Sequence, residues 1–108
     1  MFGTVSRARM KEGVTLDQVK SLFARMQDHP EERPAGAVSL IVFQSVDDPR
    51  EIWIASAFES RETYFKNADS PEQKARFERM QQFFEGPPEW HDGNVVVVAA
   101  GDRVMSAD

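Results

Sequence analysis

Few side chains in this chain could carry out acid–base chemistry, and they form no recognisable catalytic motif. Tyr64 is the single tyrosine, and His91 is one of two histidines. A phenol can donate a hydrogen bond to a substrate oxygen, and a histidine can exchange a proton near neutral pH. Each also has a structural interpretation: Tyr64 at the rim of the core, and His91 as an exposed loop residue. Tyr64 and His91 are the candidate catalytic residues.

Four other residues are candidates for binding a ligand. Trp90 could form one wall for a flat aromatic molecule, or it could close the end of a sheet. Trp53 alternates with alanines, which leaves room beside the indole for a ligand or for a side chain from a partner across a dimer. Ser56 needs a hydrogen-bond partner if it is buried, and the backbone or a ligand could supply it. Glu59 could act as a base, or it could complement the start of the next helix.

Several classes of site are excluded by composition. The chain has no cysteine, so it has no disulfide, thiolate metal site or cysteine nucleophile, and we expect a cytoplasmic protein. His29 and His91 are too far apart in sequence to form a metal-binding pair. There is no nucleophile elbow and no glycine-rich phosphate loop. We therefore predict neither a metal nor a cofactor.

Charge and hydropathy narrow the range of partners. The formal net charge of −5 would repel a nucleic-acid backbone, so no nucleic acid is expected. The longest apolar run, residues 95–100, is far shorter than the roughly 20 residues that span a bilayer. Residues 1–10 do not resemble a signal peptide. These features predict no membrane partner.

Three segments, residues 37–44, 52–58 and 95–100, are predicted to be strands that are apolar on both faces. In the first of them, one row is formed by Val38, Leu40 and Val42 and the other by Ala37, Ile41 and Phe43. Two amphipathic helices can cover only one face of a small sheet. The second apolar face predicts pairing with another copy of the chain.

Capping residues predict where the helices begin. Thr15 and Gln18 form a capping box before a helix that ends ahead of His29, and Ser60 precedes a short helix over residues 61–68. A further helix starts after Ser70, with Gln73 expected to complete a second capping box.

The remaining segments connect these elements. Residues 45–51 are expected to turn a hairpin, and residues 2–10 to form the first strand. Residues 89–93 are expected to be a loop. Residues 1–101 then form one domain, followed by a flexible tail over 102–108.

The element order is strand, helix, strand, strand, helix, strand. This order predicts an α+β fold, a ferredoxin-like βαββαβ domain with a four-stranded antiparallel sheet and both helices on one face.

The chain resembles a known family in three places. These are the stretch from Ile52 to Ser60 that leads into a helix, the start of a further helix at Ser70 and Pro71, and residues 88–93 before a valine strand. These features resemble the dimeric α/β-barrel superfamily, in particular its branch related to antibiotic biosynthesis monooxygenases. The resemblance implies a homodimer in which two sheets pack face to face, with a ligand cleft between sheet and helices in each subunit.

The resemblance also implies an activity. Some members oxidise flat aromatic substrates without a metal or flavin, which would make this chain an oxidoreductase that binds a small apolar or aromatic ligand. Haem-degrading members use an asparagine on the first strand and a histidine on the second helix, whereas here residues 2–10 contain no asparagine and residues 61–84 contain no histidine. The alternative is a non-catalytic ligand-binding or stress-related dimer of the same fold.

Overall fold

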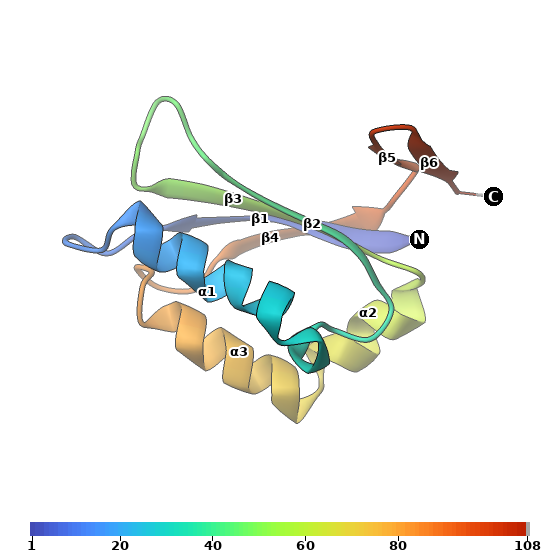
Figure 1. Ribbon diagram of the computed structural model, residues 1–108, viewed down its shortest axis with the longest axis horizontal. Coiled ribbons are helices and arrows are strands. Elements are labelled where there is room, and N and C mark those ends of the chain that lie inside the picture. Colours follow the sequence, from blue (N-terminus) through green and yellow to red (C-terminus); the bar gives the residue numbers. More distant parts are fainter. Residues whose placement is uncertain (108) are drawn as a thin grey trace.

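The computed structural model describes residues 1–107, which form a four-stranded antiparallel sheet covered on one face by helices, followed by a separate two-stranded hairpin (Figure 1). The sheet has the strand order β2-β3-β1-β4 and comprises β1 (Phe2–Arg9), β2 (Ala37–Gln44), β3 (Glu51–Phe58) and β4 (Glu89–Asn94). The helices are α1 (Leu16–Asp28), a 3-10 turn η1 (Pro30–Glu32), α2 (Arg61–Ala68) and α3 (Pro71–Gln81). The predicted ferredoxin-like βαββαβ fold is confirmed.

The predicted helix starts are confirmed, with one difference in detail. The Thr15 hydroxyl accepts a hydrogen bond from the Gln18 backbone amide, and the Gln18 side chain accepts one from the Thr15 amide at 2.8 Å. Ser60 caps α2 and Ser70 caps α3. The Gln73 side chain does not return to the cap of α3, because its oxygen accepts hydrogen bonds from Asn67 and Arg76 instead.

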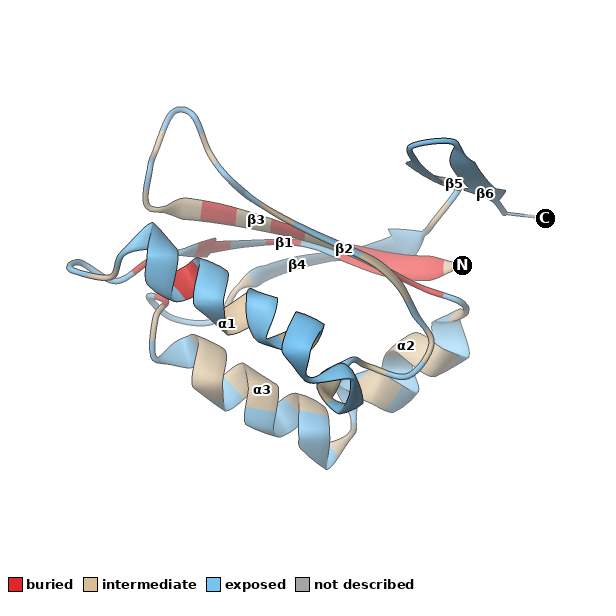
Figure 2. Ribbon diagram, viewed as in Figure 1, coloured by how far each residue is buried: buried red, intermediate tan, exposed pale blue. Residues whose placement is uncertain are grey.

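The two faces of the sheet have different surroundings. The helix-facing side is buried along β3, where Ile52 is 0% exposed (Figure 2). On the opposite side, Ile41 and Phe43 are 60% and 48% exposed, and the Phe43 ring stacks on Trp53 with the planes 8° apart. We call this surface the open face; its apolar residues are Val5, Ile41, Phe43 and Trp53. Residues 1–107 thus contain helices for one side of the sheet only.

A bulge in β2 changes the predicted apolar rows at one position. Ala37 is paired with Phe58, and the register shifts between Ala37 and Ser39. The shift brings Ala37 to the helix-facing side, whereas strict alternation placed it with Ile41 and Phe43. Local strand irregularity of this kind is not visible in a period-two pattern.

The fourth strand lies six residues earlier than predicted. The segment expected to be a loop forms β4, which pairs with β1 from Phe2↔Asn94 to Arg7↔Glu89. β4 is an edge strand with one neighbour, so it tolerates the polar residues and glycine that were interpreted as a turn. The valine segment expected in the sheet instead forms β5 (Val97–Ala100), which pairs only with β6 (Arg103–Ser106).

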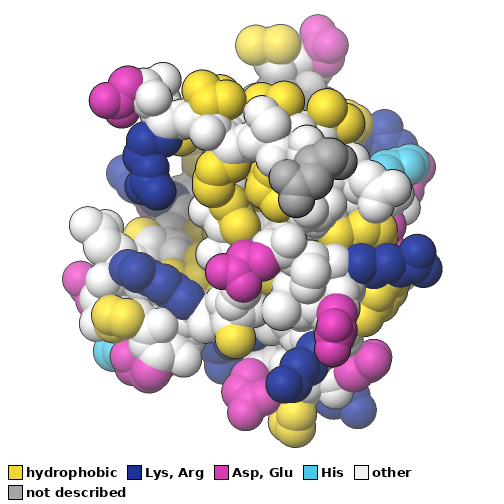
Figure 3. Space-filling view, turned by 90° about the vertical axis from the view of Figure 1, so that its right-hand side faces the viewer, with side chains coloured by type: hydrophobic (Ala, Val, Ile, Leu, Met, Phe, Trp, Pro, Cys, Tyr) yellow, Lys and Arg dark blue, Asp and Glu magenta, His cyan; other side chains and the backbone are white. Residues whose placement is uncertain are grey.

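The β5–β6 hairpin stands apart from the sheet beside the N-terminal end of β1 (Figure 1). Residues 103–106, which were expected to be loose, are therefore paired. Val96, Val97 and Val104 are 73%, 53% and 65% exposed. Hydrophobic side chains are concentrated in the upper half of this end of the molecule (Figure 3).

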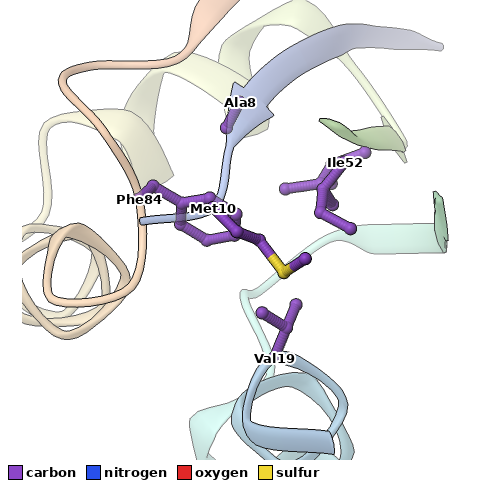
Figure 4. Packing of buried hydrophobic residues seen from close by; sticks show 6 residues of the cluster. Ala8, Met10, Val19, Ile52 and Phe84 are labelled. Carbon is purple, nitrogen blue, oxygen red and sulfur yellow. The ribbon is translucent and has the colours of Figure 1, made fainter. Parts of the chain in front are cut away.

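The apolar core occupies one end of the helix-facing side. Val19 of α1 points toward Met10, with Ile52 and Phe84 on either side (Figure 4). We call this region the packed end; its buried residues are Ala8, Met10, Val19, Ile52, Ile54 and Phe84.

Candidate active site

Beyond the packed end, the helix-facing side opens into a cleft of about 1160 Å³ between the sheet and the helices. The helices contribute mainly apolar side chains to its wall, among them Phe23, Met26, Phe77 and Met80. A volume of this order is ample for a ring-containing small molecule.

The floor of the cleft is polar because of the strand register. Thr4 of β1 pairs with Ser56 of β3 on one side and with Asp92 of β4 on the other. Ser6, two residues along β1, pairs with Ile54 and Trp90. Paired residues share a face, so Thr4, Ser6, Ser56 and Asp92 form one group, which we call the cleft floor.

Tyr64 lies over this floor from the first turns of α2. Its ring packs edge-on against Phe2 and Phe58, with centroids 5.0 and 5.5 Å apart. Its hydroxyl donates a hydrogen bond of 2.9 Å to Asp92 Oδ1. Burial raises the pKa of Tyr64 to about 12, and the hydrogen bond to Asp92 and the negative charge of that carboxylate act in the same direction. Tyr64 is therefore a protonated hydrogen-bond donor at neutral pH.

Two hydroxyls of the floor are buried without a partner. Thr4 Oγ1 and Ser6 Oγ form no hydrogen bond within residues 1–107. The Thr4 hydroxyl acts to lower the pKa of Tyr64, yet it does not reach hydrogen-bonding geometry with any group. A buried hydroxyl without a partner costs about 1–3 kcal/mol. Both residues line the cleft.

The structure brings together three of the six candidate residues found in the sequence. Tyr64, Trp90 and Ser56 all line the cleft.

The other three lie elsewhere. His91 pairs with Val5 and faces the opposite side of β4, where its Nε2 is 3.2 Å from Glu89 Oε1. Trp53 belongs to the open face, with the Arg7 guanidinium 5.5 Å from its ring centroid. Glu59 follows β3 and does not line the cleft. The acid–base groups beside Tyr64 therefore do not include His91.

Sequence reasoning missed the floor residues Asp92, Thr4 and Ser6. Asp92 was missed because residues 89–93 were expected to be a loop. The available signal was the alternation from Glu89 to Asn94, which puts Trp90, Asp92 and Asn94 on one face if the segment is a strand.

Two other kinds of feature are absent from residues 1–107. No group of three or more histidine, cysteine or acidic residues is arranged to hold a metal ion there. No helix of that part of the chain is long and apolar enough to cross a membrane.

Comparisons with known proteins agree with this architecture. No protein-family model and no curated protein matches the chain. Among solved structures, SnoaB, a cofactor-independent oxygenase from Streptomyces nogalater, superimposes with a TM-score of 0.70 at 13% identity, covering 87% of this chain and 91% of that one.

Two further structures are similar to the same extent. Rv0793 from Mycobacterium tuberculosis has a TM-score of 0.68 at 15% identity, covering 92% of this chain and 98% of that one. A protein described as an antibiotic biosynthesis monooxygenase from Chloroflexus aurantiacus has a TM-score of 0.67 at 21% identity, covering 92% and 96%.

The fold and the cleft together define a ferredoxin-like α+β domain with a ligand-sized space between its sheet and its helices. Its fold is that of the antibiotic biosynthesis monooxygenase proteins, and the predicted resemblance is confirmed at this level. Identities of 13–21% establish the fold and leave the reaction to be argued from the site.

Proposed function

We propose that the protein is a cofactor-independent monooxygenase that binds a flat aromatic substrate in the cleft. The observation that supports this proposal is the hydrogen bond from Tyr64 to Asp92 of the cleft floor, which lies opposite apolar side chains contributed by the helices. The fold likeness to SnoaB, an oxygenase that needs no cofactor, is consistent with it.

The pair is suited to removing a proton from a weakly acidic substrate. The substrate O–H would donate to Tyr64 Oη while the Tyr64 proton moves along its existing hydrogen bond to Asp92 Oδ1. Tyr64 then carries the substrate's proton and donates a hydrogen bond to the new oxyanion. The electron-rich anion reacts with O₂, one oxygen atom enters the ring system as a ketone, and the other leaves as water.

Oxygen consumption with anthrone, whose enol form has such an acidic O–H, tests the proposal. We expect Tyr64→Phe and Asp92→Asn each to lower kcat by roughly a hundredfold, the usual size of a lost acid–base group. His91→Ala tests the sequence-based prediction for that residue, and we expect a rate near that of the unaltered protein because His91 faces away from the cleft. Full activity in Tyr64→Phe would contradict the mechanism.

A non-catalytic ligand-binding protein is the second candidate. One observation favours it: the cleft lining within residues 1–107 contains no histidine, and burial raises the pKa of Tyr64 to about 12, so Tyr64 is a hydrogen-bond donor rather than a base at neutral pH. This candidate predicts saturable binding of anthrone with no uptake of oxygen. The oxygen measurement therefore separates the two functions.

We propose further that the protein is a homodimer. The open face and the β5–β6 hairpin are both apolar and exposed, and both lie on the side of the sheet that no helix of residues 1–107 covers. Two sheets packed through their open faces would bury Ile41 and Phe43, and each hairpin would lie near the partner's sheet. Sedimentation equilibrium measures the mass directly, and a monomer at micromolar concentration would contradict the proposal.

A further inference from the structure

A second polar cluster lines the cleft and centres on Arg76 of α3. Arg76 Nη1 donates hydrogen bonds to Gln73 Oε1 at 2.9 Å and to Asn67 Oδ1 at 3.3 Å. Asn67 Nδ2 in turn donates to Gln73 Oε1 at 3.3 Å. All three side chains line the cleft. Both acceptors are neutral amides, so they hold the guanidinium in place without neutralising its charge.

The charge of Arg76 is not balanced by a close carboxylate. Neither Arg76 nor Arg79 forms an ion pair in the part of the chain that the structure describes. The two arginines are three residues apart on α3 and both line the cleft, so their like charges repel. Burial is the main cause that lowers the pKa of Arg76, and the charge of Arg79 adds to it, while the negative charges of Glu72 and Glu32, neither of them in an ion pair with Arg76, act in the opposite direction. A bound anion would offset both the burial of the Arg76 guanidinium and its repulsion by Arg79.

The cleft as a whole is positive in a negative molecule. The chain has a formal net charge of −5. Only three carboxylates line the cleft, and two of these are engaged: Glu32 with Arg25, and Asp92 with Tyr64. Five cationic side chains line it, namely Arg25, Arg33, Lys74, Arg76 and Arg79. A concave site of this charge attracts anions from solution.

We propose that the cleft selects a fused-ring ligand that carries a carboxylate, and that Arg76 binds this carboxylate. The inference rests on the proposed function only in taking the cleft as the site for a ring-containing ligand. Asn67 lies three residues after Tyr64 on α2, so the two side chains share one helix face and one ligand can reach both Tyr64 and Arg76. A guanidinium presents two parallel N–H donors that match a carboxylate.

Two probes of the same shape test this. Anthracene-2-carboxylate and its neutral amide, anthracene-2-carboxamide, are titrated into the full chain and followed by fluorescence. We expect the carboxylate to bind at least tenfold more tightly than the amide, as one charge-assisted contact would produce. Arg76→Gln should remove this preference and leave the amide's affinity unchanged, while Arg76→Lys should restore part of it. Lys66→Gln, an equal loss of charge at an exposed position of α2 outside the cleft, should keep the preference.

The outcomes that would overturn the inference differ from those that would overturn the proposed function. Equal binding of the two probes by the unaltered protein, or an unchanged preference in Arg76→Gln, would overturn the role of Arg76 and leave the cleft as a ligand site. Arg76→Gln that weakens both probes equally, with no recovery in Arg76→Lys, would likewise make Arg76 a structural residue. Binding of neither probe by the unaltered protein would overturn the ring-binding cleft and both proposals with it.

Discussion

The packed end and the cleft floor lie on the same side of the same strands, yet they are built from opposite kinds of residue. Ala8 of β1 and Met10 just after it belong to the packed end, and Thr4 and Ser6 of β1 belong to the cleft floor. β3 changes in the same way from Ile52 to Ser56. The packed end buries apolar surface, which stabilises a fold. The cleft floor contains buried hydroxyls without partners, which costs stability. The contrast supports the proposal that the cleft binds a ligand.

The largest effect is expected at the packed end. Ile52 is 0% exposed, and Ile52→Ala should lower the free energy of unfolding by about 3 kcal/mol through lost burial and the cavity left behind. Urea denaturation followed by circular dichroism measures this change. A loss below about 1 kcal/mol would mean that the packed end is loosely filled and that the contrast with the cleft is weak.

A smaller effect of the opposite sign is expected at the cleft floor. Ser6 is 1% exposed and its hydroxyl has no partner within residues 1–107, so Ser6→Ala should raise the free energy of unfolding by about 1 kcal/mol. Thr4→Val, which replaces a second unpaired hydroxyl by a methyl group, should behave alike. Clear destabilisation by both changes would show that these hydroxyls have a structural partner.

The sequence was sufficient to predict much of the fold. The capping residues Thr15, Ser60 and Ser70 act within one turn, so local pattern fixes where α1, α2 and α3 begin. The pattern that makes both faces of β3 apolar is likewise contained within a single strand. These features predicted the order of the elements and a sheet with helices on one face.

The cleft floor could not be predicted in the same way, because it depends on pairing between distant segments. Asp92 approaches Tyr64 only because β4 pairs with β1, and the polar sequence of β4 resembles a loop. His91 was chosen for its chemistry, and the register that turns it away from the cleft is a tertiary property. The valine run over residues 95–100 was expected to be central because of its hydropathy, whereas β5 pairs outside the sheet.

The smallest expected effect is a change in the pKa of Tyr64, which measures the electrostatic influence of Asp92 in the cleft floor. Tyr64 is the only tyrosine, so the near-ultraviolet absorbance of the tyrosinate ion reports this residue alone. We expect a pKa of about 12 in the folded protein and the ordinary value of 10.0 in urea. Asp92→Asn should lower the folded value but keep it above 10.0, because burial is the larger cause.

The same shift sets the direction of a pH effect on stability. The folded pKa lies above the unfolded one, so the contribution of Tyr64 to the free energy of unfolding is fully present below about pH 10 and is lost as the pH rises toward 12.

Glu89→Gln is the matched control for the pKa measurement on Asp92→Asn, because Glu89 is on the same strand but its carboxylate pairs with Arg7. If Glu89→Gln lowers the pKa of Tyr64 as much as Asp92→Asn does, the shift arises from the general negative charge of β4. If only Asp92→Asn lowers it, the hydrogen bond across the cleft floor is a specific contact, which a proton transfer between Tyr64 and Asp92 requires.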